Sequence, residues 1–406
     1  MITRPLKKRI IIVIINGALL EAGLSRGGGI QNVDYYVSEC LSKKYHIEII
    51  SSYYGQFIPR TEINNNFHIS RVPVPAIDNY PPFNQKHLIY HIPYDVPYII
   101  HTIHKLRNIS KNSHIILLLH NNIPSLIIGL FGKLFGFKSV MFEGNLRPWC
   151  NPEILPNKKA LMGGAVGAFC NIANLFTGFM VAKLSDCVVV QSILIKKGMI
   201  DHHIKPLKIK VIPVGIDRLT NNYVSNFNKR NKMNMEVAFI GRLVKEKGAG
   251  MLVEVIKMAE TQLPNFKFLI FGDGEYRSEL EHRSNVIYLG WLSKEKMLSK
   301  MLDVPVAIFF QKSVGLAELE CMATGKVVIA CNRGDVPEVI KDNITGILCE
   351  LQPQDYIDAI KMIYQNKELM IAISQNAQNF VINNYSWDSI GEMWMALIDT
   401  IIQDNS

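Results

Sequence analysis

Short aliphatic runs alternate along the whole chain with longer stretches of helical polar–apolar periodicity. Runs of four to six β-branched or aliphatic residues, each followed by such a stretch, are typical of parallel strands covered on both faces. We therefore expect an α/β fold with two tandem Rossmann-like, doubly wound domains. The expected strands are 9–15, 46–51, 114–119, 138–142 and 186–190 in the first half, and 236–241, 266–272, 286–290, 306–310 and 326–330 in the second.

The boundary between the two domains is expected near residue 212. The segment KVIPVGID (210–217) and the asparagine-rich stretch after it are polar and lack periodicity, which is typical of a linker. A chain of 406 residues also suits two domains of about 200 residues each. We expect an N-terminal domain over 1–212 and a C-terminal domain that starts at 213.

The net charge changes sign at the same place. Residues 1–212 carry 24 Lys and Arg against 11 Asp and Glu, whereas the remainder carries 20 against 24. A basic half can bind nucleic acid, an anionic membrane or a phosphorylated substrate, or its lysines can simply keep the chain in solution. No RRM, KH or helix-turn-helix signature accompanies the charge, so we expect no nucleic-acid partner.

The cysteines and the N-terminus indicate a cytoplasmic protein. Seven cysteines are scattered without a CxxC pair, as reduced thiols in a cytosol would be. The apolar run Ile10–Ile15 follows basic residues, as in a signal peptide, but it is short and a glycine cluster comes after it. We interpret this run as the first buried strand.

Two stretches of the basic half raise the question of membrane contact. Residues 124–140 are apolar and aromatic, and 160–182 contain no charge. The second stretch is long enough to span a bilayer, but its glycines and asparagines favour a packed helix, with an interfacial helix as the next alternative. We expect peripheral contact with an anionic membrane, on the inner face of the cytoplasmic membrane.

Loops that follow the expected strands carry the candidate chemistry, because open α/β sheets bind ligands at the carboxyl ends of their strands. GRLVKEKG (241–248) places Arg242 and Lys247 beside a helix N-terminus, where they suit a diphosphate. FGDGE (271–275) and YLGWL (288–292) are further strand-to-turn segments. The glycine turn LSRGGGIQN (24–32) is either a phosphate-binding loop or an ordinary turn.

The second half resembles the retaining GT-B glycosyltransferases of the large family 4. The motifs that carry the resemblance are GRLVKEKG, GDGE, LGWL, GLAELECMATGK, NRGDVPEVI and YSWDSI (385–390), with a looser match at RGGGIQ, LLHNNIP and SDCVVVQS in the first half. The resemblance implies two Rossmann-like domains that face each other across a cleft. The acceptor would bind to the N-terminal domain, and the nucleotide-sugar donor to residues 213–384. The last helix (385–406) would cross back onto the first domain.

The resemblance also implies the donor-site residues. Arg242 and Lys247 match the pair that stabilises the leaving diphosphate, a catalytic role that requires no metal. Glu320 matches the second glutamate of a Glu-x7-Glu motif and would accept hydrogen bonds from the ribose hydroxyls. Gly27, Gly28 and Gly29 match a loop that closes over the phosphates. The remaining implied donor contacts are Gly241, Gly272, Leu292, Lys312 and Leu316.

The first glutamate of that motif is replaced by Lys312. Three interpretations remain open: an unusual or acidic donor sugar, a shifted motif that uses Glu318, or a protein that binds nucleotide without transferring sugar.

The acceptor side offers two candidates. Glu143 stands where relatives often have a histidine, and it could orient or deprotonate the acceptor hydroxyl as a catalytic residue. Alternatively, Glu143 is a loop carboxylate paired with Arg147. His120 ends an expected strand and is either an acceptor contact or a structural histidine.

We therefore expect an enzyme that transfers a sugar, in the manner of a hexosyltransferase, from a UDP- or GDP-linked donor. The acceptor would be a glycan or a lipid-linked molecule of envelope or polysaccharide synthesis. The alternative is a noncatalytic GT-B protein that binds nucleotide or glycan as a structural or regulatory module. No cofactor or metal is expected, since His87, His91, His101 and His104 lack cysteine or carboxylate partners at similar spacing and Pro93 and Pro97 separate the two pairs.

Overall fold

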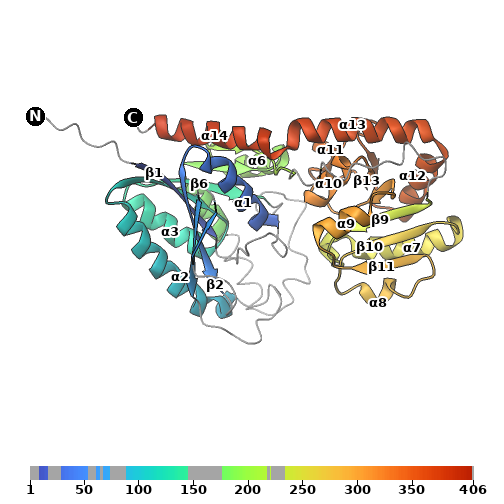
Figure 1. The fold of residues 1–406 in the computed structure, drawn as a ribbon, viewed down its shortest axis with the longest axis horizontal. Coiled ribbons are helices and arrows are strands. Elements are labelled where there is room, and N and C mark those ends of the chain that lie inside the picture. Colours follow the sequence, from blue (N-terminus) through green and yellow to red (C-terminus); the bar gives the residue numbers. More distant parts are fainter. Residues whose placement is uncertain are drawn as a thin grey trace, which may run out of the picture. The chain divides into compact units, whose positions relative to one another are not determined.

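The computed structural model describes residues 9–16, 29–53, 61–64, 67–73, 88–144, 176–216, 220 and 234–404. The chain forms two compact units (Figure 1). Unit 1 contains residues 1–213 and 391–406, and unit 2 contains residues 214–390. The first boundary lies one residue from the expected position, and the return to unit 1 lies six residues after the expected start of the last helix.

Unit 1 is built on an eight-stranded sheet in the order β3-β4-β2-β1-β5-β6-β7-β8. Its strands are β1 (Arg9–Asn16), β2 (His46–Tyr53), β3 (Thr61–Asn64), β4 (Phe67–Pro73), β5 (Ser113–Leu119), β6 (Lys138–Glu143), β7 (Cys187–Val190) and β8 (Ile209–Val211). All neighbours pair in parallel except β3, which is antiparallel to β4. The parallel core was predicted, but β3, β4 and β8 were not, and β8 occupies the start of the expected linker.

In the described part of unit 1 the helices are α1 (Gly29–Ser42), α2 (Leu88–Ile109), α3 (Ile123–Leu134), α6 (Ile193–Asp201) and α14 (Trp387–Gln403), which begins in unit 2. A 3-10 turn η1 (Pro206–Lys208) and a helical segment over 176–184 accompany them. Helix α2 runs through Pro93 and Pro97, so the two prolines that lie between the histidine pairs do not interrupt the helix. Each proline removes one helical N–H donor, yet the helix continues past both. Gly27, Gly28, Arg147 and most of 160–182 lie outside the described residues.

Unit 2 has a six-stranded parallel sheet in the order β11-β10-β9-β12-β13-β14. Its strands are β9 (Glu236–Ile240), β10 (Lys267–Phe271), β11 (Val286–Gly290), β12 (Val306–Ile308), β13 (Val327–Cys331) and β14 (Ile347–Cys349). Its helices are α7 (Ala249–Gln262), α8 (Arg277–Leu280), α9 (Lys294–Lys300), α10 (Leu316–Ala323), α11 (Val336–Val339), α12 (Pro353–Gln365) and α13 (Lys367–Tyr385), with a 3-10 turn η4 (Lys245–Lys247).

Alternate residues of the unit 2 strands face two separate hydrophobic clusters. Phe239 and Ile270 belong to the cluster that α7 and α12 complete, whereas Ala238 and Leu269 belong to the cluster with α10 and α13. Both faces of this sheet are therefore covered, which explains why its strands are apolar along most of their length. The predicted doubly wound α/β architecture is confirmed for this unit (Figure 1).

Candidate functional site

The carboxyl ends of the parallel unit 2 strands bring the predicted donor-site segments to one edge of the sheet. The loop after β9 carries Arg242, the turn after β10 carries Gly272, and Leu292 follows β11. Gly272 lies so close to the β9 loop that a Cβ on it would stand 1.9 Å from the carbonyl oxygen of Gly241. Only glycine fits such an approach. The loops after β9 and β10 are therefore packed together backbone to backbone.

Arg242 and Lys247 are near each other in the structure, as a shared anion site requires. Arg242 is exposed, whereas Lys247 is half-buried in η4. Burial lowers the pKa of Lys247, and Arg242 lowers it further, while the Glu318 carboxylate opposes both effects. An anion bound by the two cations would relieve their mutual repulsion.

Glu318 is almost completely buried at the start of α10. Its carboxylate accepts hydrogen bonds from the backbone N–H of Gly315, at 3.1 Å, and from the side chain of Gln311. Burial raises the pKa of Glu318, and Lys247 counteracts part of that rise. The carboxylate suggested as a shifted motif thus faces the lysine of the expected diphosphate pair.

Glu320, the expected ribose ligand, is buried and accepts an ion-paired hydrogen bond of 2.5 Å from Lys294 Nζ of α9. Lys312 and Leu316 flank the loop before α10, and both are half-buried. Each predicted donor residue after Gly241 therefore lies on, or beside, the carboxyl edge of the unit 2 sheet.

Asp335 holds this loop in shape, a role that we did not predict from the sequence. Its carboxylate accepts from Val314 N at 2.8 Å and from Ser313 Oγ at 3.1 Å, while its own N–H donates to the Lys312 carbonyl at 3.1 Å. Gly334 precedes it at a φ of +65°, and a Cβ there would lie 1.8 Å from the same carbonyl. The motif NRGDVPEVI contains both residues, but nothing local to it shows which loop they support.

In unit 1, the ends of β5 and β6 bring His120 and Glu143 to neighbouring positions. Pairing of Leu119 with Met141 places His120 beside Phe142 and the next residue, Asn121, beside Glu143. Asn122 caps α3 by accepting from Ser125 N at 2.8 Å, which fixes the turn between strand and helix. Gly29 begins α1, whose later turn also reaches His120.

His120 is buried against Asp34 of α1. Its Nε2 lies 2.9 and 3.0 Å from the two carboxylate oxygens of Asp34, and the rings of His120 and Phe142 meet edge to face. Burial disfavours the charged imidazole, but Asp34, Glu143 and the backbone of Phe142 together raise the pKa of His120. Asp34 was not a predicted site residue, since it stands 86 positions from its partner.

Glu143 is also buried, and it accepts a hydrogen bond of 3.0 Å from Asn121 Nδ2. The alternative pairing with Arg147 lies outside the described residues. His120, Asp34, Asn121 and Glu143 form a continuous polar group at the carboxyl edge of the unit 1 sheet, which we call the His120 cluster.

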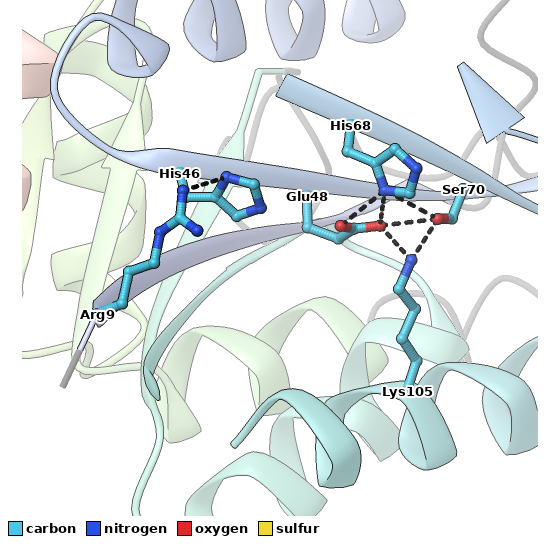
Figure 2. Close-up of polar contacts among 6 residues, drawn as sticks. All are labelled: Arg9, His46, Glu48, His68, Ser70 and Lys105. Atoms are coloured by element: carbon cyan, nitrogen blue, oxygen red, sulfur yellow. Dashed lines mark hydrogen bonds and ion pairs between the residues drawn. The ribbon is translucent and has the colours of Figure 1, made fainter. Parts of the chain in front are cut away.

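A second buried polar group in unit 1 lies near the amino ends of its strands (Figure 2). Glu48 of β2 accepts from Ser70 Oγ at 2.8 Å, contacts His68 Nδ1 at 3.0 Å and pairs with Lys105 of α2. These three partners converge on one carboxylate (Figure 2). Because it stands away from the carboxyl edge and is well supplied with donors, we interpret it as a structural ion-pair cluster.

Comparison with known proteins identifies relatives of the chain and a family profile that matches the part with the candidate donor residues. The sequence profile of the family described as "Glycosyl transferases group 1" matches residues 224–380, which include Arg242, Lys247 and Glu320. The chain is 27% identical over 258 residues to an uncharacterized 41.2 kDa protein in the cps region of Klebsiella pneumoniae, covering 61% of this chain and 68% of that one.

Two further similarities bear on function and fold. Over 204 residues the chain is 28% identical to the UDP-Gal:alpha-D-GlcNAc-diphosphoundecaprenol alpha-1,3-galactosyltransferase of Escherichia coli. This match covers 45% of the present chain and about half (52%) of that relative. The sucrose-phosphate synthase of Thermosynechococcus elongatus superposes with a TM-score of 0.75 at 15% identity, covering 98% of this chain and 100% of that one. The predicted GT-B fold is confirmed.

Proposed function

We infer that this chain is a GT-B glycosyltransferase that transfers a sugar from a nucleotide diphosphate donor to a glycan or lipid-linked acceptor, in polysaccharide or cell-envelope biosynthesis. The observation that carries this conclusion is the match of residues 224–380 to group 1 glycosyl transferases. Relatives that act in such pathways support it, including the Escherichia coli galactosyltransferase. None of these relatives supports the noncatalytic alternative.

Within this function we propose that Arg242 and Lys247 hold the donor diphosphate. As the bond between the sugar and the phosphate oxygen breaks, its electron pair passes to that oxygen, and two adjacent cations stabilise the new charge. The acceptor oxygen bonds to the freed carbon and releases its proton to the departing phosphate. We propose that Glu320 binds the ribose hydroxyls, for which its ion pair with Lys294 would have to open or be shared.

The finer assignments are also proposals. We propose a UDP-linked hexose as donor, because the similar Escherichia coli enzyme is named for UDP-Gal. We propose retention of configuration, which the resemblance to family 4 supports. The two cations supply the charge stabilisation that a metal would otherwise give, so we propose a metal-independent reaction, and UDP binding should be the same with and without EDTA.

Titration calorimetry with UDP and GDP tests the donor site. Arg242→Ala and Lys247→Ala should each weaken UDP binding by about 1.5–3 kcal/mol, the range for a charged hydrogen bond. Lys245→Ala is the matched control, because Lys245 lies in the same loop but is exposed. The affinity of this variant for UDP should equal that of the wild type. Unchanged affinity in both test variants would contradict the proposed donor site.

We also propose that unit 1 docks reversibly on an anionic membrane. Ile100 of α2 is 63% exposed, and Leu134 and Phe135 at the end of α3 are 85% and 51% exposed. Helices α2 and α3 pack together, and Lys133, in the last turn of α3, directly precedes Leu134 and Phe135. No helix among the described residues is long and apolar enough to cross a bilayer.

A further inference from the structure

The ion pair between Lys294 and Glu320 differs from an ordinary surface pair of unit 2. Lys257 and Glu254 stand one turn apart on α7, and their side chains are 45% and 56% exposed. Lys294 and Glu320, by contrast, stand 26 positions apart on two helices, and the Glu320 side chain is only 11% exposed. An exposed pair contributes little to stability, whereas a buried carboxylate needs a cation or a donor beside it. The contact with Lys294 is therefore part of how Glu320 is held.

The pair joins two loops that leave distant strands of the unit 2 sheet. Lys294 begins α9 after β11, whereas Glu320 lies in α10 after β12. β10 and β9 separate these strands, so β11 and β12 lie about 14 Å apart. Met297 of α9 and Leu319 of α10 pack in the same hydrophobic cluster, which puts both helices on one face of the sheet. The ion pair thus connects them near the carboxyl edge, where the loop after β9 carries Arg242.

An ionised carboxylate that is paired with one ammonium keeps most of its capacity to accept hydrogen bonds. Its two oxygens offer about four acceptor positions, and Lys294 Nζ, 2.5 Å from Oε1 of Glu320, takes one of them. A protonated carboxyl group would instead present a donor to a hydroxyl and would accept less well. The ammonium favours the ionised form, which is the form that two ribose hydroxyls require.

Sharing of the carboxylate is also favoured over displacement of the lysine. A charge-assisted hydrogen bond is stronger than one between neutral groups, so ribose hydroxyls are poor competitors for the place that Lys294 holds. A displaced ammonium would leave a partly buried charge in need of a new partner. Because Lys294 fixes one oxygen of Glu320, the carboxylate is oriented before the nucleotide arrives, which reduces the entropy lost on binding.

We propose that Lys294 is a positioning residue of the nucleotide site, which shares the Glu320 carboxylate with the ribose and holds it in one orientation. Lys294 acts through Glu320 and does not itself bind the ribose. Its contribution is to the preference for a ribonucleotide over a deoxyribonucleotide. This inference rests on the proposed function, in which Glu320 binds the ribose hydroxyls.

Titration calorimetry of the full chain with UDP and with dUDP, which lacks the ribose 2′ hydroxyl, tests this role. The wild type should prefer UDP. Lys294→Met should weaken UDP binding about tenfold, as the loss of one hydrogen bond would, and dUDP binding less, so that the preference falls. Lys294→Arg keeps a cation and should retain most of the preference. Lys296→Met, at an exposed position of the same helix, is the control and should bind both nucleotides as the wild type does.

A double-variant cycle tests whether Lys294 acts through Glu320. In the background of Glu320→Gln, the further change Lys294→Met should alter UDP affinity by less than about twofold, because the two residues act as one unit. A further tenfold loss in that background would show a direct contact between Lys294 and the nucleotide, and would overturn the positioning role. Tighter UDP binding by Lys294→Met alone would indicate displacement, and equal losses for UDP and dUDP would indicate a general structural effect. Either result would also overturn the proposal.

The same titrations separate this inference from the function on which it rests. If the wild type prefers UDP but Lys294→Met leaves both affinities unchanged, the role of Lys294 is wrong and the donor site stands. If the wild type binds UDP and dUDP equally, the ribose assignment of Glu320 fails together with this inference. If the wild type binds no UDP, the proposed function itself fails.

Discussion

Lys326 is a charged residue that unit 2 buries almost completely, at 1% exposure, in the turn between α10 and β13. Burial lowers its pKa to about 8, although Cys321 and Asp303 favour the charged form. The unfolded chain therefore binds this proton more tightly than the folded one does. Between pH 8 and the ordinary value of 10.5, the lysine must lose its proton when the chain folds. That loss becomes easier as the pH rises, so stability should rise with pH over this interval.

Lys326→Met should therefore stabilise the protein at pH 7. At 1.36 kcal/mol per pKa unit, the gain is at most about 3 kcal/mol, and removal of the favourable interactions of the amine with its neighbours reduces it. Urea unfolding at pH 7 and pH 10.5 should show the gain at the lower pH and little of it at the higher one. Lys300→Met, at an exposed position of α9, serves as the control. An equal gain at both pH values would show that burial of charge is not its cause.

At the same scale, the sequence predicted that residues of one local motif lie close together. Arg242 and Lys247 follow one strand within a few positions, so their proximity could be expected. Asp34 and Asp335 were missed for a physical reason: each completes a site by contacting a segment far away in the sequence, at His120 and Val314. Only the folded sheet brings these segments together.

The elements show a similar division. Strands buried on both faces, such as β1, β5 and β9, are apolar along most of their length and were predicted to within about one residue. β4 was missed because its sequence, FHISRVP, lacks the run of four or more aliphatic residues by which the other strands were predicted. β14 has three residues, too few for a periodic signal. Very short strands and strands without a continuous apolar run are therefore harder to predict than long apolar ones.

The loop between β12 and α10 depends on the absence of a side chain at Gly334. Gly334→Ala would combine a left-handed backbone with a Cβ placed 1.8 Å from the Lys312 carbonyl oxygen. We expect a loss of about 3 kcal/mol or more in the free energy of unfolding, together with weaker UDP binding. Chemical denaturation and calorimetry measure the two effects.

Gly290 provides a matched control for that substitution. It has the same φ of +65°, but a Cβ there would meet nothing closer than a side-chain atom of Tyr288 at 3.7 Å. Gly290→Ala should therefore cost only the left-handed backbone, about 1–2 kcal/mol. If the free energy of unfolding falls equally in the two variants, the close approach of residue 334 to the Lys312 carbonyl does not contribute to the loss.

At the scale of the whole molecule, the uneven charge of the chain predicts how it meets a membrane. The basic first 212 residues should draw the protein to anionic vesicles at about 0.1 M salt, where charges act over about 10 Å, and much less at 1 M, where the range is about 3 Å. Sedimentation with anionic and neutral vesicles at both salt concentrations measures this difference. Similar binding to neutral vesicles would contradict an electrostatic attachment.

Apolar contact should add to that attraction. Replacing Ile100, Leu134 and Phe135 together by serine should lower vesicle binding several-fold, because each side chain exposes at least half of its surface. Ile344→Ser is the control, since Ile344 is 55% exposed but belongs to unit 2, which is not basic: it carries 20 Lys and Arg against 21 Asp and Glu. Equal loss in the control and in the triple variant would rule out this surface as the docking site.

Unit 1 is assembled from two pieces of chain that are separated by all of unit 2. In the second piece, Gly391 packs so close to Cys40 that a Cβ would stand 2.6 Å from its sulfur, and the ring of Trp394 lies 6.2 Å from that of Phe142. The chain is synthesised from its N-terminus, so all of unit 2 leaves the ribosome before α14 can cover these side chains. The nascent protein should therefore pass through a stage in which unit 2 is complete while unit 1 still lacks α14 and exposes the side chains that this helix covers. We expect the protein to need a chaperone most at that stage. A premature stop at codon 391 would make the stage permanent.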